Sequence, residues 1–135
     1  VELIKYCQHG GMIFSEVQTV VDELLANKNK PDAIFAAADK LTTNCLRIFK
    51  TKKMIVPDDI GLIGFSNIDL AELLNPPMSV IRQPAFEMGE VAMKLLLQVI
   101  ESKRPVTDFE TKVLSTEMMI RGSTKTLSTH AKKPV

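Results

Sequence analysis

The stretch IGLIGFSNID, residues 60–69, carries the clearest strand signal of this chain. Its first part, Ile60 to Phe65, is a short continuous run of apolar residues and glycine, which is typical of a strand in the middle of a sheet. The chain then turns polar at Ser66 and Asn67. Two interpretations are open for this strand end. It is a polar turn, or it is a place where a ligand is held.

Strand-like and helix-like segments alternate on both sides of this stretch. Extended segments are expected at 1–7, 33–38, 60–65, 79–82, 111–114 and 117–121. Helices are expected from a capping box at Ser15 to Gln18, from Asp39, over 68–74, and from Pro84 to before Arg104. Regular alternation predicts an α/β fold with a three-layer parallel sheet.

Polar side chains follow three successive predicted strands, at Asp39, at Ser66 and Asn67, and at Gln83. Ligands of parallel α/β sheets bind at the carboxyl ends of the strands, where the connecting loops converge. Met12, after the first predicted strand, can add an apolar wall. This pattern suits a small polar ligand with apolar faces, such as a sugar.

Each of these residues also has a purely structural interpretation. Asp39 stands where a helix N-cap is expected, and Ser66 and Asn67 can form a turn that opens a helix. Gln83 precedes a proline, which keeps its backbone extended. The functional interpretation rests on the recurrence of polar residues at successive strand ends.

Composition and motifs exclude several classes of protein. The 135 residues have a net charge of +1 and 45% hydrophobic content, which fits one globular domain without a basic nucleic-acid-binding face. Cys7 and Cys45 lack metal-ligand or redox spacing and are expected to be free thiols in the cytoplasm. No catalytic set, phosphate loop or membrane span is apparent. We therefore expect no enzyme, no cofactor, no metal and no membrane partner.

Four phrases occur in the order PDAIFAAAD, VPDDIGLIGFSN, NPPMSVIRQPAFEMGEVAMKLLLQVIE and STEMMIRGST. Together they resemble the C-terminal part of the effector-binding domain of Lac repressor-type (LacI/GalR family) transcriptional regulators, over nearly all of residues 31–124. The resemblance implies a truncated subdomain of the periplasmic-binding-protein-like (type I) fold. Residues 1–84 and 116–122 would form the C-terminal subdomain, 85–115 a remnant of the N-terminal subdomain, and 123–135 a flexible tail.

The resemblance also implies a site for a small-molecule effector, a carbohydrate or a derivative of one. Its contacts fall on Met12, Ala38, Asp39, Ser66, Asn67 and Gln83. Ser66 stands where the family usually has an aspartate that binds sugar hydroxyls, and Ala38 stands where many relatives have a polar side chain. Serine is a weaker hydrogen-bonding partner than a carboxylate, so the usual sugar specificity is altered.

A homodimer is the expected assembly, and operator DNA is a partner only through an N-terminal module absent from this chain. The implied dimer interface comprises Thr42, Thr43, Leu46, Leu70, Leu73 and Leu74. The three last leucines follow helical i, i+3, i+4 spacing. The alternative is that they cover the sheet.

Segments near Gln83–Pro84 and Leu114–Ser115 are the expected hinges between the subdomains. The long helix after Pro84 has an apolar stripe at Met88, Ala92, Leu95, Leu96 and Val99. Without its N-terminal subdomain, we expect this helix to pack on a second chain or to leave its family position. The competing functional reading is a periplasmic-type solute-binding protein of a transport system.

Overall fold

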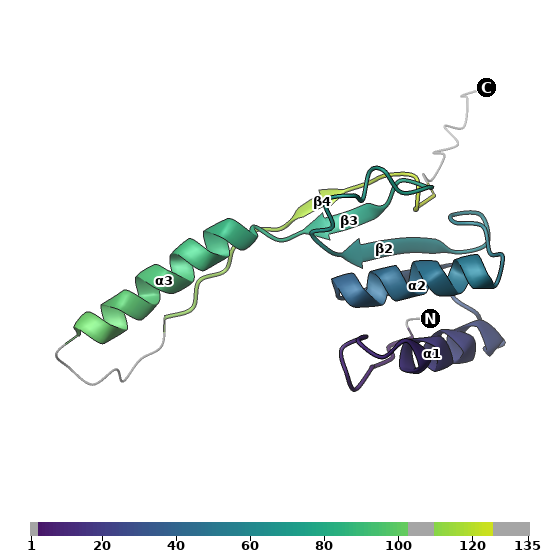
Figure 1. Cartoon of the computed structure of the whole chain (residues 1–135), viewed down its shortest axis with the longest axis horizontal. Coiled ribbons are helices and arrows are strands. Elements are labelled where there is room, and N and C mark those ends of the chain that lie inside the picture. The colour runs from purple at the N-terminus through teal and green to yellow at the C-terminus, as the bar shows by residue number, and fades with distance from the viewer. Residues whose placement is uncertain (1–2, 103–109, 126–135) are drawn as a thin grey trace, which may run out of the picture.

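The computed structural model describes residues 3–102 and 110–125, which form a four-stranded sheet with three helices (Figure 1). The strands are β1 (Ala33–Ala36), β2 (Gly61–Phe65), β3 (Ser79–Arg82) and β4 (Glu117–Met119), in that order across the sheet. The helices are α1 (Phe14–Ala26), α2 (Asp39–Thr51) and α3 (Ala85–Glu101). The α/β class is confirmed.

Three strands run parallel, and their register sets their carboxyl ends side by side. Ala36 of β1 lies opposite Gly64 of β2, and Phe65 lies opposite Ile81 of β3. The fourth strand, β4, pairs antiparallel with β3. The sheet is therefore mixed, whereas the alternation of segments predicted an all-parallel one. The reason is that β4 returns along β3 after α3 rather than through a crossover of its own.

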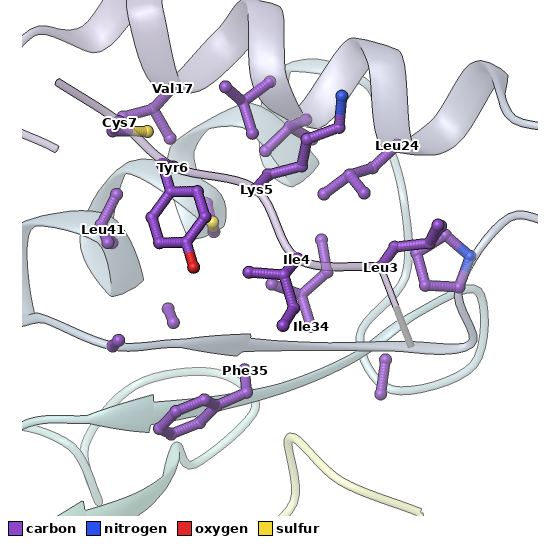
Figure 2. Close-up of a pocket in the computed structure, with 17 residues that line it drawn as sticks. Leu3, Ile4, Lys5, Tyr6, Cys7, Val17, Leu24, Ile34, Phe35 and Leu41 are labelled. Carbon is purple, nitrogen blue, oxygen red and sulfur yellow. The ribbon is translucent and has the colours of Figure 1, made fainter. Parts of the chain in front are cut away.

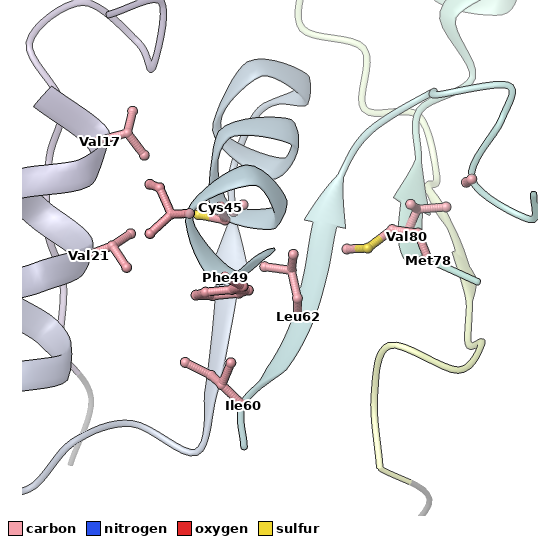
Figure 3. Close-up of a cluster of buried hydrophobic side chains, with 11 residues drawn as sticks. Val17, Val21, Cys45, Phe49, Ile60, Leu62, Met78 and Val80 are labelled. Atoms are coloured by element: carbon pink, nitrogen blue, oxygen red, sulfur yellow. The ribbon is translucent and has the colours of Figure 1, made fainter. Parts of the chain in front are cut away.

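The core lies between α2 and the first two strands (Figure 3). Ile48 and Phe49 of α2 and Ile60 and Leu62 at β2 are each at most 1% exposed. Apolar side chains three and four residues apart share one face of a helix, so the stripe of α2 lies flat on the sheet. Burial of these side chains provides the main stabilisation of the fold.

The segment that follows β4 is bonded to the sheet through serine side chains. The Ser123 hydroxyl donates to the Leu62 carbonyl at 2.6 Å and accepts from the Ser79 backbone N–H at 2.7 Å. Ser123 is fully buried, and the Thr124 hydroxyl lies 2.8 Å from that of Ser79. The predicted start of a flexible tail at residue 123 is therefore wrong. Residues 126–135 of that tail lie outside the described residues.

The predicted first strand is not part of the sheet. Residues 3–7 are extended but pair with no strand, and residues 1–2 lie outside the described part of the chain. As a result β1 is an edge strand, and Phe35 is 54% exposed. The apolar run at 33–38 is typical of a strand that is buried on both faces, but the exposure of Phe35 shows that one face of β1 is uncovered within the described residues.

Some local predictions are also wrong. Helix α1 starts at Phe14 after Ile13 without a side-chain cap, so the capping box at Ser15 does not form. Residues 68–74 form successive turns rather than a helix, with Ala71 N–H bonded to the Ile68 carbonyl at 3.2 Å. Residues 111–114 have no strand pairing. These segments are short, and local propensity is weak where tertiary contacts decide.

Helix α3 projects away from the sheet (Figure 1) and has no buried residue. Its stripe is solvent-accessible, with Met88 46% and Leu96 52% exposed. Within the described residues, no helix is long and apolar enough to span a bilayer. The expectation that α3 packs on a second chain or leaves its family position stays a prediction.

Candidate functional site

A polar network joins the carboxyl ends of β1 and β2. Asp39 is the first residue of α2, and its Oδ1 accepts hydrogen bonds from the Ser66 hydroxyl and, at 3.2 Å, from the Asn67 backbone N–H. Ser66 is 1% exposed, whereas Asp39 lies at the surface. The carboxylate therefore crosses from one strand end to the next and fixes the loop that follows β2.

The capping interpretation of Asp39 is wrong. Ala38 is the residue that precedes α2, and no side chain caps that end of the helix. Asp39 instead occupies the first turn, where a negative charge is favourable next to the helix dipole. The turn interpretation of Ser66 is correct in part: its Oγ accepts from the Ile68 backbone N–H at 3.2 Å, but the turn leads into further turns and does not open a helix. The same serine thus forms a turn and belongs to the polar network.

Asn67 ties the end of β2 to the end of β3. Its Nδ2 donates to the Gln83 carbonyl at 3.0 Å, and its Oδ1 accepts from the Gln83 backbone N–H at 2.8 Å. This two-way bond fixes the backbone one residue before Pro84, where the chain leaves the sheet for α3. Four of the predicted site residues are thereby linked in one network: Asp39, Ser66, Asn67 and Gln83.

Met12 and Ala38 lie on the neighbouring loops. The loop before α1 is anchored to α2, because Asn44 Nδ2 donates to the Gly11 carbonyl at 2.8 Å. Gly11 adopts φ +83°, a conformation that L side chains rarely adopt, and an added Cβ would lie 2.5 Å from Leu41 Cδ2 and 3.1 Å from its backbone N, so another residue would be strained there. Met12 is 70% exposed and makes no hydrogen bond to the network among the described residues.

Asn44 is a residue that the sequence reasoning missed. It is 2% exposed, and its amide positions the loop that presents Met12. The sequence did contain a signal for Asn44, because it is a polar residue next to Cys45 on the buried face of α2. A buried amide needs partners: Nδ2 donates to the Gly11 carbonyl, and Oδ1 accepts from Arg47 Nη1 at 3.5 Å.

The network can bind hydroxyl groups. Within residues 3–102 and 110–125, Oδ2 of Asp39 has no hydrogen-bond partner and is free to accept one. Gln83 also lines a cavity of about 340 Å³, whose walls include Met88 and Leu95 of α3 and Leu114. A polar edge beside an apolar hollow is suited to a small polyhydroxylated ligand. No cluster of three metal-ligating side chains occurs in the described part of the chain.

The residues of the predicted dimer interface are not equally available. Thr42 is fully buried against Gly64 in the interior, so it offers no surface to a partner. Leu74 packs partly against the core. Leu70 and Leu73, however, are 60% and 76% exposed on the turns after the network. These two leucines are the exposed part of the predicted interface.

Comparisons with known proteins agree with this architecture. A family model for the periplasmic binding protein-like domain matches residues 5–124. The chain is 32% identical over 123 residues to the HTH-type transcriptional repressor CytR of Escherichia coli K12, covering 91% of this chain and 36% of CytR. It is also 32% identical over 103 residues to the ribose operon repressor of Haemophilus influenzae, covering 76% of this chain and 30% of that repressor.

A solved structure shows the same fold. The LacI family transcriptional regulator of Enterococcus faecium, with bound ribose, superposes with a TM-score of 0.66 at 31% identity, over 84% of this chain and 41% of that one. The chain spans about a third of the length of the curated relatives that it matches. It belongs to the periplasmic binding protein-like domain family and corresponds to the C-terminal part of the effector-binding domain of LacI/GalR-family transcriptional regulators.

Proposed function

We propose that this chain is the effector-sensing and dimerisation part of a ligand-responsive DNA-binding regulator of the cytoplasm. The effector is a sugar or a sugar derivative bound between two subdomains, and operator DNA is read by a module outside this chain. The observation that carries the proposal is the network of Asp39, Ser66, Asn67 and Gln83 at three adjacent strand ends. Ribose-bound relatives and a ribose operon repressor support a sugar as the ligand class.

The network supplies directional hydrogen bonds without the aspartate that the family resemblance implies at position 66. In this chain the Ser66 hydroxyl is engaged by Asp39 and Ile68. The acceptor available to a ligand hydroxyl is therefore the Asp39 carboxylate. A carboxylate accepts charge-assisted hydrogen bonds, which are stronger than those of a neutral hydroxyl. In this proposal Asp39 takes the role of the missing carboxylate.

Asn67 connects the effector site to the junction between the subdomains. Residues 1–84 and 116–122 form one subdomain in this proposal, and 85–115 belong to the other, which explains why α3 has no buried residue. A ligand that favours one closure angle acts on the hinges near Gln83–Pro84 and Leu114–Ser115. Such a ligand shifts the population of two states by its differential affinity for them.

The test is an NMR titration of the ¹⁵N-labelled chain with D-ribose and, separately, cellobiose. Because most of the second subdomain that would enclose the ligand lies outside this chain, we expect a millimolar Kd, which corresponds to a binding free energy of about −4 kcal/mol. Amide shifts should saturate at residues 39, 66, 67 and 83. Asp39→Asn should abolish them, whereas Asp69→Asn should not, since Asp69 is an exposed carboxylate outside the network. Shifts that survive Asp39→Asn, or that spread over the surface without saturating, contradict the assignment.

The dimer proposal is tested by light scattering across a concentration series. Leu73→Glu should move the chain towards the monomer, because a charge would be placed in an apolar contact. Val113→Glu is the matched control, since Val113 is 90% exposed and lies outside the proposed interface. Equal effects of the two substitutions would contradict an interface at Leu70 and Leu73.

A further inference from the structure

The loop before α1 carries Met12 to the edge of the sheet where the polar network lies. This loop packs on the first turn of α2, because a Cβ at Gly11 would lie 3.1 Å from the Leu41 backbone nitrogen. That turn begins at Asp39, the carboxylate of the network. Figure 2 shows Cys7, from which the loop leaves the N-terminal segment, at the same end of an apolar cavity of about 670 Å³ as Leu41. Met12, the residue after Gly11, therefore lies near the start of α2.

The backbone of this loop holds Met12 at the surface. The Met12 N–H donates to the His9 carbonyl at 3.0 Å, and the Gly11 carbonyl accepts from the buried Asn44 amide at 2.8 Å. Gly10 and Gly11, which precede Met12, have no side chains that could cover it. Met12 is 70% exposed, so a small oxidant in solution has access to its side chain.

Of the seven methionines, Met12 is the exposed one at the polar network. Met78 is fully buried, and Met54 packs against the core. The Met119 sulfur accepts a hydrogen bond from Arg121 Nη2 at 3.5 Å, whereas the Met12 sulfur accepts none among the described residues. Three further methionines are exposed but lie on α3 and β4, away from the network: Met88, Met93 and Met118. Oxidation of a methionine follows the exposure of its thioether, so Met12 is the susceptible one at this edge.

The two thiols near this loop are protected from the same oxidants. Burial raises the pKa of the Cys45 thiol to about 11. Burial, and after it the negative charge of Glu16, also raises the pKa of the Cys7 thiol. The thiolate is the form of cysteine that peroxides attack, and both thiols stay protonated at neutral pH. The thioether of Met12 is therefore the reactive sulfur beside the network.

We infer that oxidation of Met12 to methionine sulfoxide lowers the affinity of the candidate site for its effector. The inference rests on the proposed function, in which Met12 is an apolar contact of the sugar. The oxidant is a peroxide: its O–O bond breaks, one oxygen bonds to the sulfur, which loses two electrons, and the other oxygen leaves as water. The apolar thioether becomes a polar S=O group, which the apolar face of a sugar would have to desolvate. A dithiol-dependent sulfoxide reductase reverses the step, releasing the oxygen as water and oxidising the dithiol to a disulfide.

The test compares sugar binding before and after mild treatment with hydrogen peroxide. Peptide mass mapping identifies each sulfur that has gained oxygen, and NMR titration with D-ribose and, separately, cellobiose gives the Kd. We expect oxygen on Met12 but not on Met78, Cys7 or Cys45, and a Kd raised about tenfold, which corresponds to about 1.4 kcal/mol of binding free energy. The midpoint of urea unfolding should not change, because Met12 is exposed. A methionine sulfoxide reductase with dithiothreitol should restore the original Kd.

Two variants form a matched pair, and each is compared with its own untreated form. Met12→Leu keeps an apolar side chain but has no sulfur at this position, so its Kd should be the same before and after peroxide. Met118→Leu removes an exposed methionine of β4 outside the network, so it should keep the tenfold loss. A third variant, Met12→Gln, replaces the thioether by a polar group and should weaken binding without any oxidant.

Three results would overturn the inference while leaving the proposed function intact. The first is an unchanged Kd in a chain whose Met12 is oxidised. The second is a loss of affinity that persists in Met12→Leu, which would place the sensitive sulfur elsewhere. The third is oxidation of Cys7 or Cys45 before Met12. An untreated chain that binds neither sugar would instead overturn the proposed function, and the inference with it, so the untreated chain separates the two failures.

Discussion

The replacement Gly64→Ala tests the packing of α2 on the sheet beneath the candidate site. A Cβ at position 64 would lie 2.5 Å from Thr42 Oγ1 and 2.7 Å from its Cγ2, whereas ordinary contacts begin at 3.4 Å. Thr42 is fully buried, and its hydroxyl donates to the Ala38 carbonyl at 2.9 Å. It cannot rotate away without losing that bond. Overpacking of this kind costs about 1–3 kcal/mol, and the bond about 1 more.

Alanine has lower conformational entropy than glycine in the unfolded chain, which returns about 0.5–1 kcal/mol. The expected net loss in the free energy of unfolding is therefore about 1–3.5 kcal/mol, measured by equilibrium urea unfolding. Gly89→Ala, in the open environment of α3, is the matched control and should cause no loss. Adding Thr42→Ala to Gly64→Ala should recover at least about 1 kcal/mol relative to additivity. An unchanged urea midpoint for Gly64→Ala, or strictly additive effects, would show that Thr42 and a Cβ at position 64 do not clash.

Three more outcomes are expected from the same structure. Ser123→Ala should lower the unfolding free energy by about 2–4 kcal/mol, because it leaves a buried N–H and a buried carbonyl without partners, whereas Ser15→Ala at the surface should be neutral. Burial raises the pKa of the Cys45 thiol from 9.0 to about 11, so the folded state holds this proton more tightly. The stability that it contributes should be intact below pH 9 and fall between pH 9 and 11 by roughly 2 kcal/mol, a decline that Cys45→Ala should reduce in urea titrations. Asn67→Asp should place a carboxylate oxygen against the Gln83 carbonyl in place of a donor, which should accelerate amide exchange at residue 83 while Asn29→Asp at the surface leaves it unchanged.

Much of the site could be read from the sequence because each polar residue directly follows an apolar strand. Parallel strands bring their carboxyl ends to one edge, so the recurrence at Asp39, Ser66 and Gln83 predicted their proximity. Their bonding pattern could not be read in the same way. Whether Asp39 caps its own helix or binds Ser66 depends on the distance between two strand ends, which is a tertiary quantity.

Elements with a local, repeated signal could be predicted from the amino-acid sequence. Periodic apolar positions specified α1, α2 and α3, and short apolar runs specified β1, β2 and β3 to within a few residues. Tertiary contacts set the edge position of β1, the burial of Ser123 and the lack of any buried residue on α3 in the described part of the chain. The physical reason is that burial and strand pairing are properties of neighbours in space. The residues flanking an element in sequence set its conformation, but they do not set what covers it.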